Sequence, residues 1–149
     1  MTGIVQSSER EAKPLTREAA LDTIAMAAML LFAHGQTTER TIVAAERLGR
    51  TLGVPVRVLP YWGELTVEIE GTSVSQIVPV KPLGVDMGKV HAITTVVDNV
   101  CNGTLRAEAA RAALAVAGHL PSASTLRFTL FAAVGACLLY TSPSPRDRG

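Results

Sequence analysis

The side chains with which this chain could do chemistry include three histidines, two cysteines and 13 aspartates and glutamates. Ser75, His91 and Asp98 offer the three side-chain types of a hydrolytic triad, namely a nucleophile, a base and an orienting carboxylate. No Gly-x-Ser-x-Gly turn surrounds Ser75, so hydrolysis is a minor hypothesis. Asp86 and Asp98 could form a carboxylate pair, but on one helix they would lie about 18 Å apart, too far to act on one bond. We therefore assign no catalytic residue.

The histidines and cysteines also offer no metal site. His34 and His119 are expected beside helix C-termini, where the helix dipole favours a partly cationic imidazole, and His91 is expected to be exposed. Cys101 and Cys137 form no Cys-x-x-Cys pair, and the histidines form no His-x-x-x-His pair. We predict neither a metal nor a cofactor, and so few cysteines favour a reducing, cytosolic setting.

Two further features could bind a ligand. The stretch from Gly84 to Gly88 is expected to open a helix, where free backbone N–H groups can bind an anion. Asp86 within it would repel a phosphate, so we interpret this aspartate as a helix cap. Arg40 is expected in the first turn of a helix, where a cation is slightly unfavourable. We therefore expect a carboxylate, or backbone carbonyls of the strand region, to hold its guanidinium.

Composition limits the possible functions. The 14 basic and 13 acidic residues give a formal net charge of +1, which offers no electrostatic footprint for nucleic acid. Hydrophobic residues make up 48% of the chain and aromatic ones 4%, so the core must consist mainly of small aliphatic side chains. Residues 15–125 suffice for one cytosolic domain. Residues 1–14 have no apolar stretch between their charges, which predicts a disordered N-terminus rather than a secretory signal.

Helical periodicity predicts two helices at the start of this domain. The first is capped by Thr16, covers residues 17–33 and stops near Gly35, where a left-handed cap suits glycine. The second is capped by Thr37 or Thr38 and ends at Gly53, before a proline that forbids its continuation.

The period then changes from helical to alternating. Three short strands are expected at 54–58, 65–69 and 76–80, with connections short enough to favour antiparallel pairing. Two more helices follow, one from Asp86 to Gly103 and one from Thr104 to Gly118. We expect the last helix to be rich in alanine and to carry Leu105, Ala109, Ala112, Ala113 and Val116 at helical spacing. The fold class is therefore α+β: two helices, a three-stranded antiparallel sheet, two helices, and then a truncated transmembrane helix.

The last part of the sequence is an uncharged, almost wholly apolar run at residues 128–140. It corresponds to about 20 Å of helix, against roughly 30 Å of hydrocarbon in a bilayer. We interpret residues 126–137 as the start of a first transmembrane helix, in contact with lipid through 128–140. Residues 138–149 resemble a translated sequencing adapter, so we treat them as a non-native tail. The alternative is a short buried helix that closes a soluble domain.

Residues 32–54 resemble the helix pair that marks the threonine/serine exporter family. That pair typically contains Gly-x-x-Thr-x-Arg, and Gly35, Thr38 and Arg40 fall on this pattern. Residues 85–93, 102–105 and 109–114 are similar to the helices that lead into the family's first membrane segment. The chain departs from the family at Ile42, where an acidic residue is frequent, and at residues 60–63. These departures bear on the transported substrate more than on the architecture.

The resemblance implies the cytosolic N-terminal portion of a proton-driven exporter of threonine or serine in the bacterial inner membrane. Arg106, Arg111 and Arg127 supply the basic flank expected on the cytoplasmic side of a span. Relatives that export small dicarboxylates such as succinate make that substrate an alternative, and an oligomer is left open. The rival classes are a soluble hydrolase-like or ligand-sensing domain and a membrane-anchored interaction module.

Overall fold

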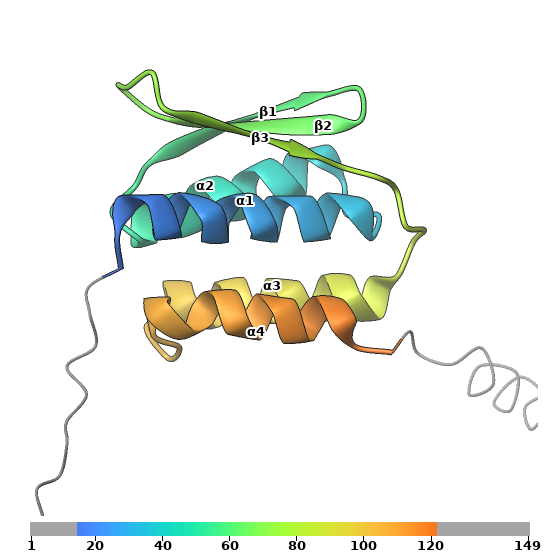
Figure 1. Cartoon of the computed structure of the whole chain (residues 1–149). Coiled ribbons are helices and arrows are strands. Elements are labelled where there is room, and N and C mark those ends of the chain that lie inside the picture. Colours follow the sequence, from blue (N-terminus) through green and yellow to red (C-terminus); the bar gives the residue numbers. More distant parts are fainter. Residues whose placement is uncertain (1–14, 122–149) are drawn as a thin grey trace, which may run out of the picture.

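The computed structural model describes residues 15–121, which form four helices and a three-stranded antiparallel sheet (Figure 1). The predicted α+β class and the predicted order of these elements are confirmed. The expected membrane helix at 126–137, the N-terminus at 1–14 and the tail at 138–149 lie outside the described residues. The elements are α1 (Arg17–Ala33), α2 (Thr38–Thr51), β1 (Val56–Tyr61), β2 (Glu64–Ile69), β3 (Ser75–Pro79), α3 (Met87–Cys101) and α4 (Ala107–His119).

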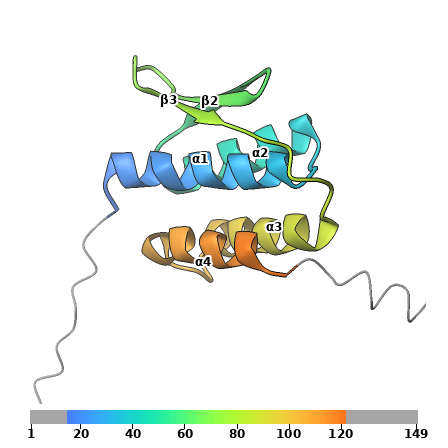
Figure 2. The ribbon, with the colours of Figure 1, turned by 45° about the vertical axis from the view of Figure 1, so that its right-hand side comes forward.

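The elements stack in three layers, with the sheet above α1 and α2, and α3 and α4 below them (Figures 1 and 2). The middle position of α1 explains its sequence, because a helix covered from both sides must be apolar nearly all round. It contacts β2 and β3 above and α3 and α4 below. Its buried residues accordingly point in every direction: Ala20, Leu21, Thr23, Ile24, Ala25, Ala27, Ala28, Leu31 and Ala33.

The sheet covers the helices with one face only. Its strands have the order β1-β2-β3, and Val58 pairs with Val67 while Thr66 pairs with Ile77. Val58 and Val67 are buried, whereas Ile77 is exposed on the opposite face. This alternation is expected of an antiparallel sheet with one dry and one wet face.

Predicted side-chain caps begin three of the four helices. The hydroxyl of Thr16 accepts the Ala19 N–H at 3.2 Å, the hydroxyl of Thr37 accepts the Arg40 N–H at 3.4 Å, and the Asp86 carboxylate accepts the Lys89 N–H at 3.1 Å. Each bond satisfies a backbone donor that the first helical turn leaves free.

The predicted start of α4 is wrong. Thr104 does not begin this helix, because its N–H and its hydroxyl both donate to the Asn99 carbonyl and close α3. The helix begins at Ala107 and buries Ala110, Leu114 and Ala117, while Val116 is exposed. Alanines lie on all sides of this helix, so its sequence has no clear apolar stripe, and packing against α1 and α3 decides which face is buried.

Candidate functional site

The family-pattern residues Gly35, Thr38 and Arg40 lie together where α1 ends and α2 begins. Gly35 has a φ of +90°, a left-handed conformation that L side chains rarely adopt. A Cβ atom on Gly35 would lie 2.9 Å from Val85 Cγ2 and 3.1 Å from Val85 Cα. Glycine is thus needed here for its backbone conformation and for the close approach of the segment before α3.

Two backbone hydrogen bonds fix that segment against the turn. The Leu83 N–H donates to the Ala33 carbonyl at 2.9 Å, and the Asp86 N–H donates to the His34 carbonyl at 3.0 Å. They satisfy carbonyls that the end of α1 would otherwise leave free. The α1–α2 turn and the start of α3 therefore form one continuous backbone unit.

His34 lies in this unit and is buried, with 4% of its surface exposed. Burial lowers the pKa of the imidazole, nearby Lys89 lowers it further, and Asp86 opposes the shift. The lowered pKa runs against the expectation of a partly cationic His34, because burial penalises the charged form of the imidazole. His119 does lie at the end of α4, with Nδ1 2.7 Å from the Ala115 carbonyl oxygen, and His91 is exposed as predicted.

Arg40 is exposed, and its guanidinium makes no hydrogen bond or ion pair with the described part of the chain. The expectation that a carboxylate, or backbone carbonyls of the strand region, hold it is wrong, because no described carboxylate pairs with it and the sheet lies on the far side of α2 (Figure 1). The side chain instead borders a groove between α2 and α3. The groove is lined by Leu31, Gln36, Arg40, Val43, Ala44, Arg47, Thr94, Val97 and Asp98.

An ion pair between Arg47 on α2 and Asp98 on α3 bounds this groove. Hydrogen bonding to Asp98 raises the pKa of the Arg47 guanidinium, so Arg47 keeps its charge. Arg40 therefore offers a cation to a ligand, while the charge of Arg47 is already compensated. The chemistry available is recognition of a small carboxylate, with the Gln36 amide nearby and an aliphatic floor below.

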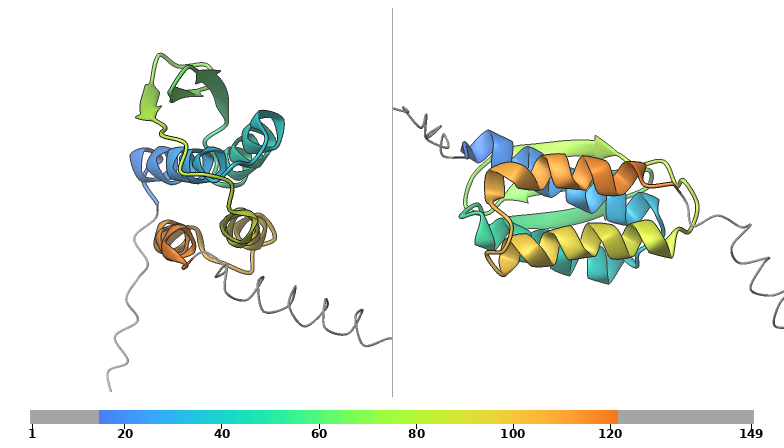
Figure 3. Two further views of the ribbon diagram at one scale, coloured as in Figure 1. Left: turned by 90° about the vertical axis from the view of Figure 1, so that its right-hand side faces the viewer. Right: turned by 90° about the horizontal axis from the view of Figure 1, so that it is seen from below.

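The structure does not bring the hypothetical triad together. Ser75 begins β3 in the sheet layer and His91 lies on α3 in the bottom layer, with α1 and α2 between them (Figure 3). Asp98 is engaged with Arg47. These three residues therefore cannot form a charge-relay arrangement, whose members must be within hydrogen-bond distance.

A second polar cluster joins the three layers at Asp22 on α1. Its carboxylate accepts a hydrogen bond of 3.1 Å from the Gln76 amide of β3 and pairs at 3.1 Å with Arg111 of α4. Within residues 15–121, no group of three or more His, Cys, Asp or Glu side chains could hold a metal ion.

Sequence reasoning missed both of these long-range clusters. Arg47 and Asp98 are 51 positions apart, and Asp22 and Arg111 are 89 apart. In the sequence, each of these charged residues looks like an ordinary residue on the solvent-exposed face of a helix. Only a packing arrangement that sets α2 against α3, and α1 against α4, identifies the partners.

The sequence of this domain matches the model of a known protein family. The family model described as "Putative threonine/serine exporter" matches residues 22–142. The chain belongs to this family. The match begins within α1 and includes all the later described helices and strands together with the apolar run at 128–140. The threonine/serine exporter family resemblance seen at residues 32–54 is therefore confirmed across most of the chain.

Membership assigns the protein to a family of membrane exporters of small molecules. No curated protein and no solved structure gave a significant match. None of the helices that the structure describes combines the length and hydrophobicity needed to span a bilayer. The roles of Gly35, Thr38 and Arg40 in the exporter family stay predictions.

Proposed function

We propose that residues 15–121 form the cytosolic domain of a proton-driven exporter of threonine or serine in a bacterial inner membrane. The observation that carries this proposal is the family match, which runs from α1 through the described domain into the uncharged run at 128–140. A domain followed directly by such a run is the arrangement expected of a soluble part attached to a membrane part.

The proposed orientation rests on charge. Arg106 is exposed near the start of α4, and Arg127 directly precedes the apolar run. Basic residues this close to a span favour the cytoplasmic side. Arg111 adds less to this bias than its sequence position suggested, because it is paired with Asp22.

The test is an export assay in cells that express the complete coding sequence as it stands in the genome. After loading with a threonine-containing dipeptide, we expect lower intracellular threonine than in cells with an empty vector. An uncoupler should abolish the difference. Cells that express only residues 15–121 should show no export, because these residues include no helix able to span the bilayer.

The results separate the alternatives. Efflux of succinate without efflux of threonine or serine would assign the dicarboxylate substrate. If neither succinate nor threonine or serine is exported, and residues 15–121 hydrolyse an ester, the enzyme hypothesis would replace the exporter proposal. Efflux that persists with the uncoupler would reject proton coupling but leave the export function standing.

The α2–α3 groove favours ligand sensing as a second function. Arg40 is a cation without a partner among the described residues, and it lies beside an amide and aliphatic side chains. Titration of isotope-labelled protein with threonine and with succinate should shift backbone amide signals at residues 36–47 and 94–98. The shifts should disappear in Arg40→Gln and persist in Arg50→Gln, a matched change on the same helix.

A further inference from the structure

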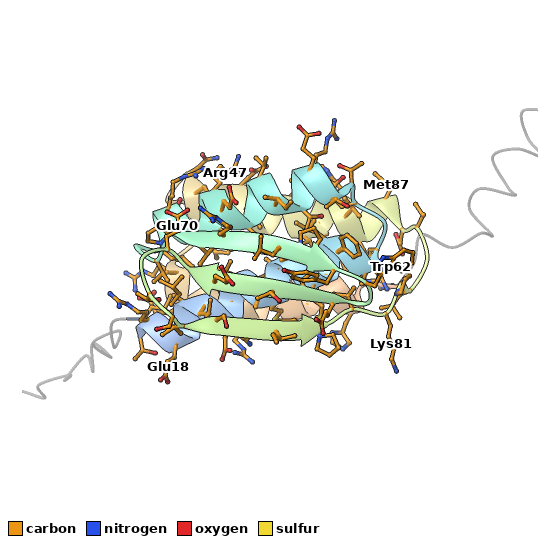
Figure 4. All side chains as sticks on the ribbon, turned by 90° about the horizontal axis from the view of Figure 1, so that it is seen from above. Glu18, Arg47, Trp62, Glu70, Lys81 and Met87 are labelled. Carbon is orange, nitrogen blue, oxygen red and sulfur yellow. The ribbon has the colours of Figure 1, made fainter. Side chains whose placement is uncertain are left out.

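Large apolar side chains are exposed together at one end of the molecule. Trp62 is exposed over 104% of its reference surface, Val85 over 77% and Leu83 over 70%. We define the apolar end by these three residues together with Tyr61, Met87 and Leu120, which are also exposed. Figure 4 shows Trp62, Lys81 and Met87 at the same end of the molecule.

Three separate parts of the chain build the apolar end. Tyr61 ends β1 and Trp62 lies in the β1–β2 turn. Leu83 and Val85 lie between β3 and α3, Met87 begins α3, and Leu120 is the C-cap of α4. The Val80 N–H donates to the Gly63 carbonyl at 2.8 Å and joins the first two parts. Gly35 packs against Val85 and holds the second part against the helices. The side chains are thus presented by fixed backbone.

Large exposed apolar side chains that gather at one end of a domain indicate a site of contact with a membrane or another molecule. The residue types favour a membrane interface, because tryptophan and tyrosine combine an apolar ring with a polar group and collect at the headgroup level. Lys81 and Lys89 lie beside these residues and suit anionic headgroups. The side chains project from turns and from the ends of strands and helices, and Leu120 also lines an apolar groove between α3 and α4. Exposed side chains at such positions suit a fluid lipid surface.

The course of the chain also favours a lipid surface at the apolar end. The described domain ends at this end of the molecule, at Leu120 and Pro121 (Figures 1 and 3). Seven residues, 121–127, separate Leu120 from the uncharged run that starts at Phe128. Even when fully extended they span at most about 25 Å. If the run enters a bilayer, the apolar end must lie close to the bilayer surface.

We propose that the apolar end rests in the headgroup region of the lipid bilayer, with Trp62 as its deepest side chain. This inference rests on the proposed membrane location of the apolar run. It fixes the orientation of the domain, with the long axes of the helices pointing toward the membrane and the α1–α2 turn with Gly35, Thr38 and Arg40 on the membrane side.

Trp62 is the one tryptophan of the chain, so its emission reports on this end directly. The 149-residue protein is mixed with vesicles of phosphatidylcholine and phosphatidylglycerol, and binding is measured by flotation. We expect the Trp62 emission to shift to the blue, to be quenched by brominated acyl chains and to be protected from acrylamide. The matched control is Trp62→Phe with Ile77→Trp, which moves the probe to the exposed face of the sheet while the chain stays otherwise the same. Its emission should stay accessible to acrylamide and insensitive to brominated lipid.

The outcomes distinguish this inference from the proposed function. Protein that floats with Trp62 still accessible to acrylamide would overturn the inference and leave the membrane location standing. Protein that does not float would count against both. A blue shift without quenching by brominated lipid would show that protein, rather than lipid, covers this end, and equal quenching at positions 62 and 77 would show that the domain has no preferred orientation. Either result would overturn the inference.

Discussion

Single residues decide the geometry of the turn that joins the middle helix layer to the start of α3. Gly35 provides a left-handed backbone and space for Val85, and buried His34 accepts the Asp86 N–H with its carbonyl. Arg40 stands beside this turn without a partner in the described structure. The turn thus combines a tightly constrained backbone with an exposed cation, which fits a binding role for Arg40 better than a structural one.

Gly35→Ala should lower the free energy of unfolding by about 2–5 kcal/mol. Left-handed backbone costs about 1–2 kcal/mol for a residue with a Cβ, and overpacking against Val85 adds about 1–3 kcal/mol. Gly53→Ala is the matched control, because Gly53 also has a positive φ, +72°, but nothing lies within 4 Å of its Cβ position. Urea unfolding of both variants measures the difference, and equal losses would contradict the close approach to Val85.

His34 should make stability depend on pH. Its pKa is lowered in the folded protein, so below about pH 6.5 the unfolded chain binds the proton more tightly and stability falls as the pH drops. Urea unfolding at about pH 7.5 and about pH 5.5 should show a smaller loss in His34→Gln than in the wild type. His91→Gln, which changes an exposed histidine on α3, should keep the wild-type slope. Identical slopes in all three proteins would contradict the lowered pKa of His34.

At the scale of elements, α1 and α4 show that the surroundings of an apolar helix decide how much of its surface is buried. The sheet and the lower helices cover α1 from both sides, so apolar residues all round this helix are buried. α4 is equally rich in apolar residues but is covered on one side only. Its outer residues Ala112 and Val116 line a shallow apolar groove with Ala92 and Val96 of α3.

Two substitutions in α4 test which face is buried. Leu114 is 0% exposed and Val116 is 66% exposed. Leu114→Ala should cost about 2–5 kcal/mol through the lost contacts and the cavity. Val116→Ala should change stability by about 0.5 kcal/mol or less, as is typical of surface positions. Comparable losses in thermal or urea unfolding would mean that the helix is rotated from the orientation described.

The whole molecule is a layered unit in which all three layers share one core. The core continues from Val58 and Val67 of the sheet through Ile24 of α1 to Ile93 and Leu114 of the lower helices. Asp22 adds polar contacts to both outer layers. Such a core should be stable without the segments that flank it.

Residues 15–125 should therefore fold by themselves and stay monomeric without detergent. Their urea transition should be cooperative, because every layer shares the same core. Analytical ultracentrifugation and circular dichroism measure these properties. The full 149-residue chain, with its apolar run, should instead partition into vesicles. A requirement for detergent in the shorter protein would show that the domain boundary near residue 125 is wrong.

The sequence alone determined the element order, the caps and the family. Local signals carried these predictions: Thr16, Thr37 and Asp86 cap helices through bonds three residues away, and the period changes sharply near Val54. The family pattern at Gly35, Thr38 and Arg40 is likewise contiguous, although the roles of these residues are untested.

The tertiary structure decided which charges pair, which face of α4 is buried and how His34 titrates. Arg47 finds Asp98 and Asp22 finds Arg111 only because helices far apart in the sequence pack side by side. Packing of α4 against α1 and α3 buries Leu114 and leaves Val116 exposed, and the alanine-rich sequence has no apolar stripe that would predict this. The apolar end, too, is assembled from three distant segments. Pairing, burial and desolvation depend on contacts between residues that are remote in sequence, and local patterns carry no information about them.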